Sequence, residues 1–209
     1  MKKIIIFALL LISSFSTLFA DDYAALKLGF HFPDATDSGF IIGGEFGKQI
    51  DESLDVGVSF DWFQKEFSEY KKVMEENNAG VSSEVKKKLS ETTLYTFPFM
   101  AIFSGRFEIM NRLDINMIGA LGMEMLMADY DISSEYAQIN PDLEDTTEWA
   151  FAFAWRVGVG ASYRLGSRSD ICAEIDYHSS KPSVDLDDDL EREYNMSGIM
   201  GRIGIRFYL

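Results

Sequence analysis

Three aspartates near the C-terminal end, Asp185, Asp187 and Asp189, have the D-x-D-x-D spacing of a calcium-binding loop. Position six of such a loop would here be Leu190 rather than glycine, and position twelve would be Met196 rather than glutamate. The segment is therefore not an EF-hand, because that loop needs the sharp glycine turn and the bidentate glutamate. The spacing predicts at most a weak cation site, and we expect no bound metal and no cofactor.

Two long polar segments, 128–148 and 179–195, concentrate negative charge. The first carries acids without a base, and the second adds Glu191 to the three aspartates above. Such segments at one end of a fold would produce a strong negative field that attracts divalent cations or a basic partner. They could equally be solvated loops that only repel neighbouring molecules.

Overall charge and residue types exclude several classes of protein. The 209 residues hold 34 acids and 19 lysines and arginines, a formal net charge of −15. A nucleic-acid partner is not expected, because it would need a basic face. With only Cys172, His31 and His178, the chain has no internal disulfide and no histidine-rich metal centre. It also has no glycine-rich phosphate loop and no nucleophile elbow.

The rest of the chain alternates large apolar residues with small or charged ones, which is the period of a β-strand with one apolar face. Short polar connections also alternate with long ones, as in an antiparallel barrel with both termini at one end. Eight strands are predicted at 23–32, 39–48, 54–63, 92–103, 112–127, 149–164, 170–178 and 196–209.

The small face of these strands identifies the interior. It carries glycine, alanine and single ionisable groups, which suit a narrow lumen, whereas the large apolar face forms a band suited to lipid. A soluble lipocalin-type barrel, with the apolar face inside, is the alternative. We expect a lumen ion-pair network at mid-height, formed by Lys27, Glu45, Arg156, Glu174 and Arg202. We expect aromatic girdles at the membrane surfaces, formed by Trp62, Trp149, Tyr163, Tyr177 and Phe207.

The first twenty residues have the pattern of a secretory signal peptide. Lys2 and Lys3 precede an apolar run, and small and polar residues follow up to Ala20, where we place cleavage. An uncleaved membrane anchor is the alternative, although the run is short for a span. The predicted organisation is a signal peptide, 1–20, and one exported barrel domain, 21–209.

Segment 64–91 differs from the other long connections. It carries six acids and six bases, with helix-forming stretches at 65–76 and 83–89. An insertion of this length exceeds what a hairpin needs. We therefore predict a helical insertion in the second external loop, either folded over the barrel mouth or acting as a lid that binds a partner.

Three stretches resemble a known family: YTFPFMAIFSGRF at 95–107, NMIGALGM at 116–123, and RVGVGASYRL followed by AEIDY within 154–177. In these stretches the chain resembles the eight-stranded outer-membrane β-barrel family, the OmpA/OmpX-like group. The last strand, GRIGIRFYL, resembles the family's C-terminal insertion signal, with Leu209 in place of the usual aromatic residue. The resemblance implies an all-β, up-and-down transmembrane barrel in the outer membrane, in contact with its lipid.

For function, the interpretation is a non-catalytic barrel that presents acidic external loops for surface interaction or envelope integrity. The alternative is a narrow, porin-like gated pore for small solutes or ions, opened by exchange of salt-bridge partners. An enzyme is not expected. A Ser–His–acid set of Ser180, His178 and Glu191 or Glu193 resembles the lipid A deacylases at that point alone, and His178 would lie inside the barrel.

Overall fold

The computed structural model describes residues 22–76, 82–132, 146–187 and 190–209, so the predicted signal peptide lies outside the described residues. In this part of the chain every regular element is a β-strand, and no helix is long and apolar enough to cross a membrane. The strands are β1 Asp22–Pro33, β2 Gly39–Gln49, β3 Leu54–Glu76, β4 Ser82–Met110, β5 Leu113–Ile132, β6 Thr146–Arg164, β7 Ser169–Ser180, β8 Ser183–Asp187, β9 Leu190–Glu193 and β10 Gly198–Tyr208.

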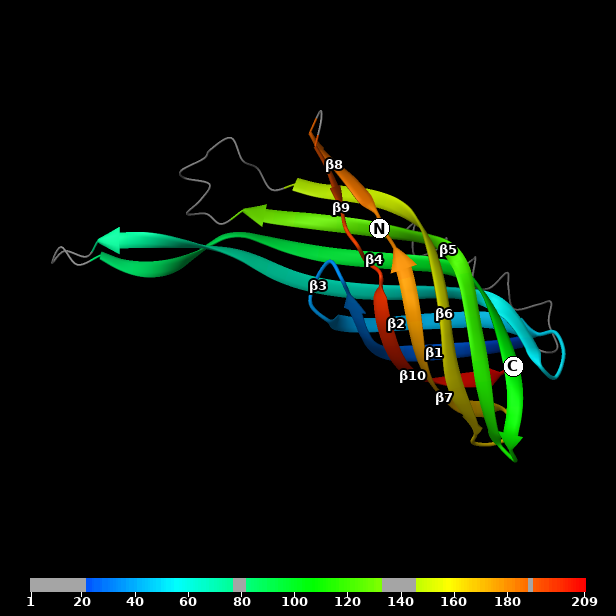
Figure 1. Cartoon of the computed structure of the whole chain (residues 1–209). Helices are drawn as coiled ribbons and strands as arrows, with labels where there is room; N and C mark the ends of the chain where they lie inside the picture. The colour runs from blue at the N-terminus through cyan, green and yellow to red at the C-terminus, as the bar shows by residue number, and fades with distance from the viewer. Residues whose placement is uncertain (1–21, 77–81, 133–145, 188–189) are drawn as a thin grey trace, which may run out of the picture.

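Eight of these strands form a closed antiparallel barrel, in the order β1-β10-β7-β6-β5-β4-β3-β2. The wall closes between the first and last strands, where Leu28 pairs with Ile203, so the barrel has no free edge along this seam. Figure 1 shows the eight strands wrapped around a common interior. The predicted closed, up-and-down barrel is confirmed.

Alternate residues face lipid and lumen, as the period of two predicts. On β1, Leu26 and Phe30 are 56% and 55% exposed, whereas Lys27 between them is 3% exposed. On β7, Ile175 is 63% exposed and its neighbour Glu174 is 6% exposed. The apolar face therefore lies outside and the charged face inside, which excludes a soluble barrel with an apolar interior.

The predicted helical insertion was wrong. β3 continues as a strand to Glu76 and β4 begins at Ser82, and their ladder includes the pairs Lys71–Lys87 and Val73–Val85. Neither predicted helix is longer than the roughly 12–15 residues at which an isolated helix is marginally stable in water. The barrel already holds the two strands side by side, so each further ladder pair forms without a new nucleus. Figure 1 shows β3 and β4 running well past β1, β2, β7 and β10.

Strand β4 has two local features. It continues to Met110, beyond the predicted strand end at 103, and only two residues join it to β5, with Arg112 at a φ of 78°. Its register with β3 passes from Phe60–Phe99 directly to Phe63–Thr96, with Pro98 between them, because proline has no N–H for the ladder.

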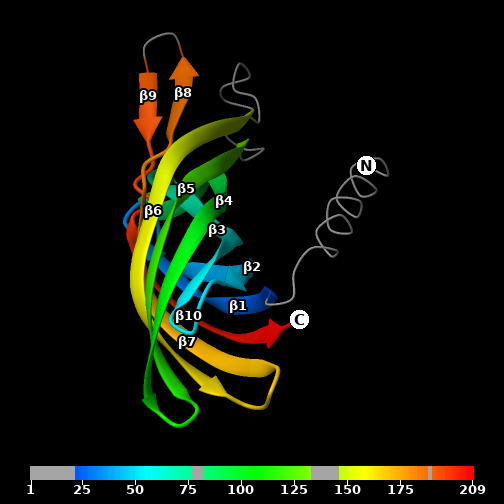
Figure 2. The same cartoon turned by 90° about the vertical axis from the view of Figure 1, so that its right-hand side faces the viewer.

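The predicted loop 179–195 instead contains the short hairpin of β8 and β9, in which Asp185 pairs with Glu191. Figure 2 shows this hairpin rising beyond the loop end of the barrel. The other acidic loop is also partly strand, because β5 extends to Ile132 and β6 begins at Thr146.

Candidate functional site: the filled lumen and its two ends

The centre of the lumen holds an ion-pair network that begins at Lys27 on β1. Its ammonium group contacts Glu45 on the neighbouring β2 and lies 2.6 Å from a carboxylate oxygen of Glu174 on β7. All three side chains are nearly excluded from solvent. The lysine therefore joins two strands that are not adjacent in the barrel.

Arg202 on β10 continues the network across the lumen. Its guanidinium lies 2.5 Å from Glu174, 3.0 Å from Asp176 and 2.8 Å from Asp61 of β3. Asp61 also accepts a hydrogen bond of 2.5 Å from Arg156 on β6. We call these seven residues the mid-lumen network: Lys27, Glu45, Asp61, Arg156, Glu174, Asp176 and Arg202.

The mid-lumen network brings the predicted residues together, but not in one simple cluster. Four of them form a chain of contacts: Glu45 to Lys27, Lys27 to Glu174, and Glu174 to Arg202. Arg156 joins this chain through Asp61, which contacts both arginines. An isolated charge at such a depth would cost several kcal/mol, so each group needs a partner of opposite sign. The pairs therefore fill and cross-link the centre of the barrel.

Towards the loop end, two histidines lie next to the mid-lumen network. His178 on β7 contacts Glu124 on β5 at 2.5 Å, and its ring centroid lies 5.6 Å from that of His31 on β1. Ser180 is also buried, and its hydroxyl has no hydrogen-bond partner among the described residues. The carboxylate at His178 is thus Glu124, which the Ser–His–acid alternative did not include.

The loop end of the lumen is closed by apolar side chains that the sequence analysis did not identify. Residues on the inner face of the barrel pack there against β8 and against the segment that follows β9. We call this group the apolar plug: Ile41, Phe63, Leu94, Leu126, Ala128, Ala150, Val184, Tyr194, Met196 and Met200.

Hydrogen bonds hold the hairpin side of the apolar plug in place. The N–H groups of Asp34 and Ala35 donate to the carbonyls of Ser197 and Asn195, at 3.0 and 2.8 Å. The N–H of Met196 donates to the carbonyl of Ser180 at 3.0 Å, and the hydroxyls of Tyr130 and Tyr194 are hydrogen-bonded. The segment that follows the hairpin is therefore tied to the barrel rim.

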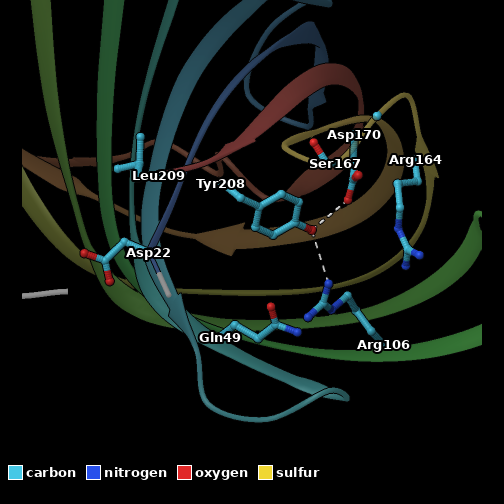
Figure 3. A pocket seen from close by; sticks show the side chains of 9 residues that line it. Asp22, Gln49, Arg106, Arg164, Ser167, Asp170, Tyr208 and Leu209 are labelled. Carbon is cyan, nitrogen blue, oxygen red and sulfur yellow. Dashed lines mark hydrogen bonds between the residues drawn. The ribbon is translucent and has the colours of Figure 1, made fainter. Parts of the chain in front are cut away.

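At the turn end, a second charged layer lies below the mid-lumen network. Asp55 contacts Arg106 at 3.1 Å and Arg206 at 2.7 Å. A polar pocket of about 410 Å³ opens beside this layer. Figure 3 shows the Tyr208 hydroxyl between two of the pocket's side chains: it accepts a hydrogen bond from Arg106 at 3.2 Å and donates one to Asp170 at 2.7 Å.

The other predicted residues lie outside the lumen. Trp62, Trp149, Tyr163, Tyr177 and Phe207 are all on the outer face, between 37% and 53% exposed. Asp185 and Asp187 are on β8 and Glu191 is on β9, whereas Asp189 lies outside the described residues. Among the described residues, no group of three or more His, Cys, Asp or Glu is arranged to hold a metal ion.

The sequence analysis did not name two members of the mid-lumen network, Asp61 and Asp176. Alternation along β3 and β7 places both on the inner face, but position along a strand does not give their level, because tilted strands are staggered around a barrel. Leu94 and Ala128 also fall on the small face at the loop end, where apolar residues indicate an interior without water.

These features define an outer-membrane β-barrel. The chain belongs to the outer membrane protein beta-barrel domain family, whose model matches residues 5–207. The protein is accordingly located in the outer membrane, with its apolar outer face in lipid. In a comparison with curated proteins, none matches the chain.

Solved structures with a similar fold are also outer-membrane proteins. OprG from Pseudomonas aeruginosa has a TM-score of 0.55 at 14% identity, over 91% of this chain and 96% of that chain. Neisserial surface protein A has a TM-score of 0.50 at 14% identity, over 90% and 96%. A major outer membrane protein from Thermus thermophilus has a TM-score of 0.51 at 9% identity, over 91% and 100%. At these identities the likeness concerns the fold.

Proposed function

We propose that this protein is a non-catalytic outer-membrane platform for surface interaction or envelope integrity. The observation that carries the proposal is the filled lumen: a charged layer at the turn end, the mid-lumen network, and the apolar plug succeed one another along the barrel. Eight strands leave an interior just wide enough for side chains, and here the side chains occupy it. Strands β3 and β4 meanwhile extend beyond the barrel, where a partner could reach them.

Planar-bilayer recording of the refolded protein tests this proposal. We expect no steady conductance steps, because water and ions would have to pass both buried ion pairs and the apolar plug. The control is a barrel of the same family with known conductance, inserted under the same conditions. Regular conductance steps in the wild-type protein would contradict the platform and favour a pore.

A narrow gated pore is the second candidate, and one observation favours it. Arg202 touches three carboxylates, Asp61, Glu174 and Asp176, so its partners could exchange without leaving a charge unpaired. A pore of this kind would respond to Glu174→Gln, which removes one of the three charges. If the protein is a platform, we expect the variant to show no conductance in planar bilayers. If it is a pore, its open probability should change.

A surface role requires the strands beyond the barrel. A variant that lacks residues 70–88 should keep the barrel ladder intact, because β4 pairs with β5 from Ser90 onward. This variant would be expressed in a strain in place of the wild-type protein. We expect loss of surface interaction with unchanged resistance of the envelope to detergent. Detergent sensitivity in this strain, equal to that of a strain without the protein, would assign the role to envelope integrity instead.

The acidic residues of the β8–β9 hairpin belong to the same proposal. The backbone register sets Asp185 opposite Glu191. Acids concentrated in one short segment attract divalent cations or a basic partner. Calorimetric titration with Ca²⁺ should give weak binding that Asp185→Asn reduces, and identical heats for both proteins would remove the cation from the proposal.

Export through cleavage near Ala20 also remains a prediction, testable by sequencing the mature N-terminus.

A further inference from the structure

The polar pocket at the turn end of the barrel combines both signs of charge. Its lining includes two arginines, Arg106 and Arg164, and two aspartates, Asp22 and Asp170. Figure 3 shows these four side chains around one opening. The volume of about 410 Å³ falls within the range of small-molecule sites, about 300–1,000 Å³. A polar lining of this kind suits a small charged ligand rather than a lipid chain.

Two of these residues, Arg164 and Asp170, lie opposite each other but do not pair. The β6–β7 register sets them directly across the ladder, where opposite charges ordinarily attract. The guanidinium of Arg164 instead lies 3.6 Å from Asp114, which is too long for a hydrogen bond. Within the described part of the chain, no ion pair joins Arg164 to Asp170. A cation and an anion are therefore held side by side at the pocket without neutralising each other.

The carboxylate of Asp170 has one oxygen that the chain does not use. The residue is 2% exposed, and its Oδ2 accepts a hydrogen bond of 2.7 Å from the hydroxyl of Tyr208. Its Oδ1 has no hydrogen-bond partner among the described residues. A buried carboxylate oxygen without a donor is costly, so it indicates the position of a donor from outside the chain. An ammonium group, with three N–H donors, meets this need.

Arg164 is the arginine of the pocket that remains available to a ligand. Arg106 is nearly buried, donates to the hydroxyl of Tyr208 at 3.2 Å and contacts Asp55 at 3.1 Å. The side chain of Arg164 is 47% exposed, and its contact with Asp114 is long. A guanidinium binds a carboxylate through two parallel hydrogen bonds, so Arg164 offers a position for a carboxylate beside Asp170.

We propose that this pocket binds a free amino acid, with its ammonium group at Asp170 and its carboxylate at Arg164. Both charges of an amino acid are attached to one carbon atom, which matches two opposite charges that face each other across a ladder. A simple anion would meet the aspartates of the lining, and a simple cation would meet its arginines. Gln49 and Ser167, also in the lining, offer hydrogen-bonding groups to a short polar side chain such as that of serine.

Three ligands test the proposal on the unchanged protein. Calorimetric titration of the refolded barrel in detergent would compare L-serine with serinamide, which lacks the carboxylate, and with N-acetylserine, which lacks the ammonium group. We expect serine to bind at least about tenfold more tightly than either analogue. Equal affinity for the three ligands, or no binding of serine up to about 10 mM, would overturn the proposal.

Two variants assign each charge of the ligand to its residue. Arg164→Gln should abolish the preference for serine over serinamide, and Asp170→Asn should abolish the preference for serine over N-acetylserine. Asparagine keeps an oxygen that accepts from Tyr208, so the second variant retains that hydrogen bond. The matched control is Arg168→Gln, because Arg168 is exposed in the same turn and does not line the pocket. It should keep the affinity for serine within about twofold of wild type. Unchanged preferences in both pocket variants would show that the ligand binds elsewhere.

A lipid headgroup is the other source of a paired ammonium and acid. O-phosphoethanolamine carries these charges farther apart, and it should bind more weakly than serine. Tighter binding of O-phosphoethanolamine would overturn the assignment to a free amino acid. The inference goes beyond the proposed surface role, because the pocket lies at the opposite end of the barrel from the β8–β9 hairpin. Conductance tests the platform and calorimetry tests the pocket, so either can fail without the other.

Discussion

The mid-lumen network and the apolar plug fill the lumen in different ways. In the mid-lumen network each basic group contacts a carboxylate, as where Arg202 lies 2.8 Å from Asp61. In the apolar plug, uncharged side chains such as Phe63, Leu94 and Met196 pack together without solvent exposure. The difference follows from the cost of burial: a buried charge must be neutralised within the protein, whereas an apolar side chain needs only close packing.

This contrast separates two ways of stabilising the barrel. Pairs within the lumen cross-link strands that are not neighbours, such as β6 and β3 through Arg156 and Asp61, and so stiffen the barrel. The apolar plug instead joins the barrel wall to the β8–β9 hairpin, because Val184 and Met196 belong to the same buried cluster as Leu94. The centre of the lumen therefore depends on paired charge, and the hairpin depends on apolar packing.

The largest expected effect comes from Arg202→Leu in the mid-lumen network. The substitution leaves Asp61, Glu174 and Asp176 close together without their shared cation, which should cost about 3–5 kcal/mol in the free energy of unfolding. Urea titration of the refolded barrel in detergent measures it. Arg164→Leu is the matched control, because Arg164 is half-exposed and lies 3.6 Å from Asp114, and it should cost no more than about 1 kcal/mol. Equal costs at both positions would remove the distinction between buried and exposed charge.

A smaller effect is expected from Met196→Ala in the apolar plug. Met196 is fully buried, and its truncation leaves a cavity that should cost about 2 kcal/mol. Met123→Ala is the control, since Met123 is 57% exposed on the lipid face. The loss should appear first as protease sensitivity of the β8–β9 hairpin, whose flank Met196 anchors. A variant as resistant as wild type would mean that the apolar plug does not hold the hairpin.

The sequence predicted the barrel well because its main signal is local. Alternation along each strand decides which face meets lipid, and Lys27 beside Leu26 and Leu28 is sufficient to place that lysine inside. Which lumen charges pair is not local. Asp61 reaches Arg156 and Arg202 because the staggered strands β3, β6 and β10 bring them to one level, and no spacing along the chain reports that level.

The two regions that sequence reasoning missed depend on contacts between distant segments. Helix propensity favoured a helix at 65–76, but the barrel aligned β3 with β4 and the ladder continued outward. Tyr194 was similarly predicted to lie in a loop, and Met196 at the start of the last strand, whereas the structure places both in the apolar plug.

The smallest expected effect tests most directly how burial changes a charged pair. In a double-mutant cycle, Arg164→Gln and Asp114→Asn should show an attractive coupling of no more than about 1 kcal/mol, because Arg164 is half-exposed. Urea titration of the refolded barrel in detergent measures it. The corresponding cycle at Lys27 and Glu45 should show a larger attractive coupling, because their pair is buried. Added salt should weaken the coupling of the exposed pair and leave the coupling in the lumen nearly unchanged. Equal coupling in the two cycles would mean that burial does not distinguish these pairs.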